Sequence, residues 1–130
     1  MDRASGPRDI SVRHLRGRLA EAVAADYFFV SGFVPLGANL RAGHLELDLV
    51  LEEGDRLIVV EVRSRGAGAL ESALASVRRK KREQIKRATE RIWRRWLHKR
   101  THLQRVRFDI VTVAFSGSRV ELEHVKSAFA

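Results

Sequence analysis

Two apolar runs joined by a short polar turn constrain this chain more than any other part of its sequence. In residues 44–51 leucine occupies every odd position, and Glu46 and Asp48 stand between the leucines, which is typical of a half-buried β-strand. Residues 53–55, Glu-Gly-Asp, have the composition of a tight turn, and residues 57–63 form a second run. The pattern predicts a β-hairpin in which the leucines share one face and the two carboxylates the other.

The remaining periodic segments place further helices and strands around this hairpin. Apolar spacing predicts helices at residues 12–30 and 70–97 and strands at residues 34–41, 105–115 and 119–124. The order of one helix, three strands, one helix and two strands favours an α/β fold with a central mixed β-sheet flanked by α-helices. A chain of 130 residues with 45% hydrophobic content suffices for one domain, which we assign to residues 11–130 after a flexible N-terminus at residues 1–10.

Carboxylates on the predicted hairpin are unusual, because central strands of a small α/β sheet are covered on both faces. A connection at residues 53–56 sets Asp48 directly across from Glu61, and Glu46 across from Arg63. Two carboxylates at the ~5 Å of a cross-strand pair repel by roughly 3 kcal/mol at an effective dielectric of 20. A divalent metal with hard oxygen ligands is one interpretation. The other interpretation is a solvated outer face on which Asp48 and Glu61 never approach each other. The pattern favours these two interpretations equally.

A lysine interrupts the apolar stripe of the helix predicted at residues 70–97. The stripe runs through Val77 and Ile85 and leaves Lys81 at the inward position between them. One interpretation is a side chain that reaches solvent from the edge of the stripe. Beside paired carboxylates, the alternative is an ammonium group that stabilises charge developing on a phosphate and positions the attacking water.

The net charge of +9 is concentrated in one segment. Residues 78–100 hold twelve Lys and Arg side chains against two Glu, so the rest of the chain is close to neutral. Such a stripe attracts a polyanion, and each phosphate that it neutralises releases counterions. Nucleic acid, in particular DNA, is the predicted partner, ahead of a merely solvated helix face or an acidic protein. The predicted nucleic-acid-binding residues are Arg78, Arg79, Lys80, Arg82, Lys86 and Arg87.

Short motifs extend along nearly the whole chain. They are Gly17 with Glu21, ELDLV at 46–50, VVEVR at 59–63, ASV at 75–77 followed by Lys81, RFDIV at 107–111, and AF at 128–129. In order and spacing they resemble the YraN-like family of uncharacterised bacterial proteins. That family is assigned to the restriction-endonuclease-like, PD-(D/E)xK nuclease fold and is similar to archaeal Holliday-junction resolvases. The resemblance implies a Mg²⁺- or Mn²⁺-dependent endonuclease that hydrolyses DNA phosphodiester bonds, with branched or repair intermediates as candidate substrates.

The resemblance also implies roles for individual residues. The implied metal ligands are Asp48, Glu61, the backbone carbonyl of Val62, and Glu21, and the implied catalytic residues are Glu21, Asp48, Glu61, Arg63 and Lys81. Arg63 stands in place of the motif lysine, and Leu45 in place of a family glycine. Because arginine keeps its proton at neutral pH, Arg63 cannot act as a general base. In an active enzyme Arg63 would hold a phosphate or a water, and Lys81 would take the place of the motif lysine. The alternative is that the chain is an inactive nucleic-acid-binding module on a degenerate nuclease scaffold.

Several other kinds of chemistry are disfavoured. The chain has no cysteine, which excludes disulfides, thiolate metal sites and cysteine nucleophiles and fits a cytoplasmic protein. No apolar run approaches the ~20 residues that a membrane span requires, so we predict no membrane partner. Four histidines lack a metal-ligand spacing: His44, His98, His102 and His124.

Two further pairs of residues have competing interpretations. Trp93 and Trp96 could stack on bases, but their helical spacing is more typical of a core or dimer interface. Arg107 and Asp109 alternate on one strand, and we predict that they pair with charges in a structural role. A symmetric homodimer would suit cleavage of a junction or of two strands.

Overall fold

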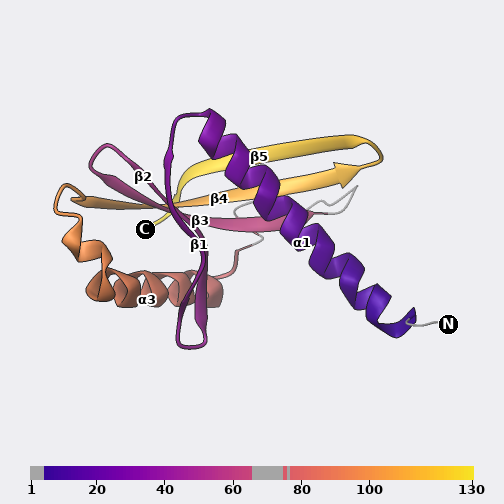
Figure 1. Cartoon of the computed structure of the whole chain (residues 1–130), viewed down its shortest axis with the longest axis horizontal. Helices are drawn as coiled ribbons and strands as arrows, with labels where there is room; N and C mark the ends of the chain where they lie inside the picture. The colour runs from indigo at the N-terminus through magenta and orange to yellow at the C-terminus, as the bar shows by residue number, and fades with distance from the viewer. Residues whose placement is uncertain (1–4, 66–74, 76) are drawn as a thin grey trace.

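The computed structural model describes residues 5–65, 75 and 77–130. Its elements are α1 (Ser5–Val30), β1 (Val34–Ala42), β2 (Leu45–Glu53), β3 (Arg56–Arg65), α3 (Arg79–Arg95), the 3₁₀ helix η1 (Leu97–Lys99), β4 (Arg105–Ser116) and β5 (Arg119–Phe129). The strands form one sheet in the order β1-β2-β3-β4-β5, and only the β3–β4 pair is parallel (Figure 1). The predicted α/β fold with a central mixed sheet is confirmed, and it is consistent with a restriction-endonuclease-like architecture.

Both faces of the sheet are covered by a helix, because its middle strand is apolar on both sides. Along β3, Leu57 and Val59 pack in the cluster under α3, whereas Ile58 and Val60 pack in the cluster under α1. A strand buried in this way has a continuous apolar run rather than an alternating one. The α3 helix also provides the crossover that a parallel pair of strands requires.

β2 changes the face of its side chains partway along the strand. Leu45 and Leu47 belong to the cluster under α3, whereas Leu49 and Leu51 belong to the cluster under α1. The prediction that the odd-numbered leucines share one face is therefore wrong. The change falls at Asp48, directly beyond the end of the ladder between β2 and β3. From that point β2 continues beside β1 alone, and a two-stranded ribbon twists more strongly than a wide sheet.

The helices differ from the predicted ranges at their N-terminal ends. α1 begins at Ser5 rather than at residue 12, so residues 5–10 of the segment predicted to be flexible are helical. Residues 1–4 lie outside the described residues. Among the described residues, no helix combines the length and the apolar character that a membrane crossing requires.

The helix predicted at residues 70–97 is wrong in extent. Residues 70–74 and 76 lie outside the described residues, and α3 starts only at Arg79, because Arg78 is extended with φ −74° and ψ 165°. The carbonyl of Val77 accepts a hydrogen bond from Arg82 Nε at 2.7 Å, so a side chain takes the place of a helical N–H. Val77 is buried as a separate anchor between the helix and the sheet.

A buried ion pair joins β4, β5 and α1. Arg107 Nε and Nη2 donate to the two carboxylate oxygens of Asp109, each at 2.9 Å. His124 Nε2 lies 2.7 Å from Asp109, the Ser127 N–H donates to it at 3.0 Å, and the Tyr27 hydroxyl bonds the other His124 nitrogen at 2.9 Å. Burial alone would raise the pKa of Asp109, but these donors outweigh burial and lower the pKa. The sequence predicts pairing of Arg107 and Asp109 with neighbouring charges, and the structure shows that they pair with each other and that Asp109 also contacts His124.

We expect Asp109→Ala to lower the free energy of unfolding at pH 7 by about 3–5 kcal/mol, because the variant leaves the Arg107 charge buried without its partner. A lowered folded-state pKa stabilises the protein above the unfolded value of about 4, and this stabilisation is lost as the pH falls through the folded value. The wild type should therefore lose its advantage over the variant in acid. Urea unfolding at pH 7 and at pH 3 measures both effects.

Asp55→Ala is the matched control. Its carboxylate lies 3.6 Å from Arg105 Nε, and both side chains are exposed. A surface pair of this kind contributes at most about 1 kcal/mol. Equal destabilisation by the two substitutions would contradict the role assigned to Asp109.

Candidate active site

β2 and β3 separate at Asp48, and the carboxylate of Asp48 occupies the fork between them. The antiparallel ladder has the predicted register and ends at the Leu49↔Val60 pair. Beyond it, Asp48 Oδ2 accepts a hydrogen bond from the Val62 N–H at 2.9 Å, in place of a backbone partner. The N–H and C=O of one strand residue point to the same neighbouring strand. The Val62 carbonyl therefore also faces the fork.

The end of the ladder also separates Glu46 from Arg63. Glu46 Oε2 lies 3.7 Å from Arg41 Nε on β1, in the register Arg41↔Glu46. Arg63 Nη1 instead lies 3.7 Å from Glu61 Oε2 on its own strand. The predicted cross-strand pair of Glu46 and Arg63 is wrong, because it assumed that pairing continues past Asp48.

Glu61 is the most deeply buried acid of the fork, with 4% of the residue exposed. Burial raises its pKa, and the negative charge of Asp48 raises it further. The protonated Glu61 side chain also hydrogen-bonds Asp48, and the result is a pKa of about 8 despite the opposing charges of Lys81 and Arg63. Of the two interpretations that the sequence leaves open, the structure has the one in which Asp48 and Glu61 approach each other.

Two cations from different elements approach the same oxygen of Glu61. Lys81 Nζ, from the first turns of α3, lies 4.0 Å from Glu61 Oε2, and Arg63 Nη1 comes from β3. Both side chains are about two-fifths exposed, so their other donors face solvent. The inward position of Lys81 agrees with the interruption of the apolar stripe. Ammonium and guanidinium groups in this arrangement are suited to holding a phosphate.

Glu21 adds a third carboxylate from α1. Burial and the negative charge of Asp48 raise the pKa of Glu21, and a hydrogen bond from the Asn39 side chain partly opposes the rise. Sequence reasoning missed Asn39, which lies in β1 with φ 51°. Asn adopts this left-handed conformation more readily than most residues. The one available signal was an Asn inside a strand, where this residue type is depleted.

The donors at the fork are those that Mg²⁺ and Mn²⁺ prefer. Carboxylate and carbonyl oxygens are hard ligands. The pKa values of Glu61 and Glu21 are raised first by burial and then by the charge of Asp48, and a cation would stabilise the ionised form of both acids. In the part of the chain that the structure describes, no group of three or more His, Asp and Glu side chains is arranged to hold a metal ion. The residues therefore fit a site with one or two protein carboxylates, a backbone oxygen and substrate phosphates.

The predicted nucleic-acid-binding residues lie in two different surroundings. Four are exposed: Arg78, Arg79, Lys80 and Arg87. Arg82 is engaged within the protein, because its Nε donates to the Val77 carbonyl and its guanidinium lies 5.5 Å from the centre of the Phe129 ring. Lys86 Nζ lies 3.4 Å from Glu83 Oε2 at the surface.

The fold and the fork define an α/β protein with a buried acidic site at a divided strand pair. The chain belongs to the uncharacterised protein family UPF0102, whose family model matches residues 20–113. UPF0102 is the YraN-like family, so this finding confirms the resemblance inferred from the motifs. The matched residues include Glu21, Asp48, Glu61 and Lys81.

Relatives from several bacteria support the assignment. A UPF0102 protein of Sorangium cellulosum is 36% identical over 127 residues, which cover 97% of this chain and 88% of the relative. One from Nitratidesulfovibrio vulgaris is 36% identical over 121 residues, or 92% and 87% of the two chains. One from Frankia casuarinae is 36% identical over 115 residues, or 87% and 94%.

We expect Glu61→Gln to stabilise the metal-free protein at alkaline pH. The raised folded-state pKa of Glu61 means that the wild type loses stability as the pH rises from the ordinary value of 4.5 to about 8. A glutamine does not titrate, so the variant should exceed the wild type at pH 9 by on the order of 2–4 kcal/mol, at about 1.4 kcal/mol per pKa unit. Urea unfolding in EDTA at pH 5 and pH 9 measures the difference.

Glu53→Gln, at the exposed end of β2, is the control and should change stability equally at the two pH values. If the wild type were instead more stable than Glu61→Gln, by a margin that increased from pH 5 to pH 9, the raised pKa assigned to Glu61 would be wrong.

Proposed function

We propose that this protein is a divalent-metal-dependent endonuclease that hydrolyses phosphodiester bonds of DNA. The observation that carries the proposal is the buried Glu61 beside Asp48, with Arg63 and Lys81 at the same carboxylate. Paired buried acids reduce stability unless a cation joins them. Groups with strongly shifted pKa values and specific charged partners are typical of functional sites.

In this proposal Asp48, Glu61 and the Val62 carbonyl would hold Mg²⁺ or Mn²⁺, and Glu21 on α1 would add negative charge beside them. The bound ion lowers the pKa of a water molecule and offsets negative charge on the phosphate. The oxygen donors at the fork support this set of ligands, as do acids whose pKa is raised by burial and by the charge of Asp48.

Arg63 and Lys81 bind the phosphate that is cleaved. Arg63 remains protonated, so it donates hydrogen bonds to phosphate oxygens and accepts no proton. The Lys81 ammonium stabilises the charge that develops on the same phosphate. A water oxygen bonds to phosphorus while one P–O ester bond breaks. One water proton ends on the leaving sugar oxygen and the other passes to solvent.

The exposed cations at the start of α3 lie next to Lys81 in the sequence and extend the phosphate-binding surface beyond the fork. Electrostatic attraction to this surface favours DNA as the partner. A DNA substrate also agrees with the predicted cytoplasmic location. A homodimer that cuts two strands stays a prediction.

Asp48→Asn tests the proposal most directly. We expect this variant to lose the binding heat of Mg²⁺ and Mn²⁺ in calorimetric titration. It should also lower metal-dependent cleavage of a panel of branched, duplex and single-stranded DNA by at least about 100-fold. The fold should persist, because an amide oxygen can still accept the Val62 N–H and a repelling charge is removed.

Asp55→Asn, in the exposed β2–β3 turn, should bind metal and cleave like the wild type. Cleavage at the wild-type rate in both Asp48→Asn and Glu61→Gln would refute the assignment of the site.

Arg63→Lys separates a working nuclease from an inactive binding scaffold. A lysine at this position can lose its proton and serve as a general base, so we expect the metal-dependent cleavage rate to rise by about tenfold or more. Arg65→Lys, on the same strand but paired with Glu123, is the matched control and should leave the rate unchanged. If neither the wild type nor Arg63→Lys cleaves DNA while both bind it, the chain is the inactive binding module instead.

A further inference from the structure

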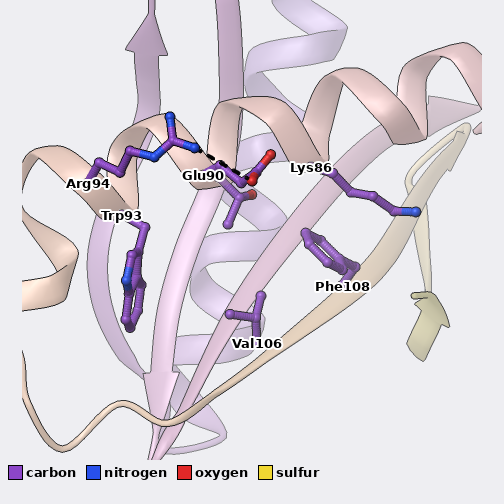
Figure 2. A pocket seen from close by; sticks show the side chains of 7 residues that line it. Lys86, Glu90, Trp93, Arg94, Val106 and Phe108 are labelled. Atoms are coloured by element: carbon purple, nitrogen blue, oxygen red, sulfur yellow. Dashed lines mark ion pairs between the residues drawn. The ribbon is translucent and has the colours of Figure 1, made fainter.

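An apolar pocket of about 350 Å³ lies between the C-terminal half of α3 and the first residues of β4. Figure 2 shows the rings of Trp93 and Phe108 on two sides of the pocket, with Val106 between them. Thr89 also lines the pocket but offers no free hydroxyl donor, because its Oγ1 donates to the Ile85 carbonyl at 2.8 Å. Pockets of this size and lining accept small aromatic groups.

Cations stand at the edge of this pocket. Lys86 and Arg94 line it together with Glu90, and Arg94 Nη2 lies 3.9 Å from Glu90 Oε2. Lys86 Nζ lies 3.4 Å from Glu83 Oε2. Both ion pairs lie at the surface, where such pairs contribute at most about 1 kcal/mol. The two cations can therefore exchange their carboxylate partners for phosphates at little cost.

Aromatic rings beside cations bind single-stranded nucleic acid, since bases stack on the rings while phosphates pair with the charges. The same helix carries Lys81 at the fork, and Trp93 follows about 18 Å further along its axis. A strand whose phosphate is held by Lys81 can therefore reach the pocket within a few nucleotides. In a duplex the faces of each base are covered by its neighbours, so only an unstacked base can enter.

We infer that the Trp93–Phe108 pocket binds an unstacked base of single-stranded DNA a few nucleotides from the cleaved bond. This inference rests on the proposed nuclease function and narrows its substrate class to DNA with an unpaired segment. An apolar peptide could use the same rings, but the excess of cations along α3 favours a polyanion.

The test compares two oligonucleotides with the same backbone: a 12-nucleotide oligothymidylate, and the same strand with abasic central positions. Affinities are measured by fluorescence anisotropy in EDTA, so that no cleavage occurs. The wild type should bind the intact strand about tenfold more tightly than the abasic strand, because one stacked base contributes about 1–3 kcal/mol. Trp93→Leu should abolish this difference, whereas Trp93→Phe should keep most of it.

The salt dependence of binding should not change in Trp93→Leu, because an uncharged ring releases no counterions. Trp96→Phe is the matched control, since Trp96 does not line the pocket. In that variant Trp93 is the one remaining tryptophan, so its fluorescence reports the pocket directly. The intact strand should quench it and the abasic strand should not, which keeps the test valid if Trp93→Leu fails to fold.

Equal affinity of the wild type for the two strands, with unchanged Trp93 emission, would overturn the inference. Absence of binding to either strand would also overturn it and would leave the pocket to a protein partner. Base-dependent binding in a protein that cleaves no DNA would support the pocket and refute only the proposed nuclease. Cleavage of DNA without base-dependent binding would support the proposed nuclease and refute the role of the pocket.

Discussion

Two carboxylates held side by side in a fork of low dielectric determine how the rest of this molecule is arranged. Glu61 is buried against Asp48, and both its burial and this neighbour disfavour the ionised form. The sheet accommodates the pair by letting β2 leave β3, so that the Asp48 side chain takes over a backbone hydrogen bond of Val62. Arg63 and Lys81 then approach from two different elements. The acidic site and the divided sheet are therefore one structural feature.

The hairpin register could be predicted from the sequence because turn residues and alternation specify it locally. The point where pairing stops could not, because it depends on the Asp48 side chain replacing a backbone partner. The Glu46–Arg63 pair is wrong for that reason. The start of α3 likewise depends on a side chain that replaces a backbone partner, because Arg82 Nε donates to the Val77 carbonyl. Asn39 was missed because periodicity carries no information about the backbone angle of a single residue.

The basic segment shows how composition counts charges without giving their directions. Lys81 approaches a buried acid, and Arg82 lies against the Phe129 ring, so both side chains have partners within the protein that the net charge does not reveal. Arg100, beyond the end of α3, donates to Glu52, whereas Arg78, Arg79, Lys80 and Arg87 are exposed. The helix thus serves the core, the acidic site and the surface with different positions of one amphipathic sequence.

The hydrogen bond between Tyr27 and His124 joins residues 97 positions apart. The entropic cost of closing so long a loop grows only slowly with its length. α1 also packs on β2, β3 and β4 through Ala20, Ala24 and Phe28, so this hydrogen bond adds the last strand to a helix that the middle of the sheet already holds. Glu21 lies on the same helix. The position of one acid at the fork is therefore coupled to both ends of the chain.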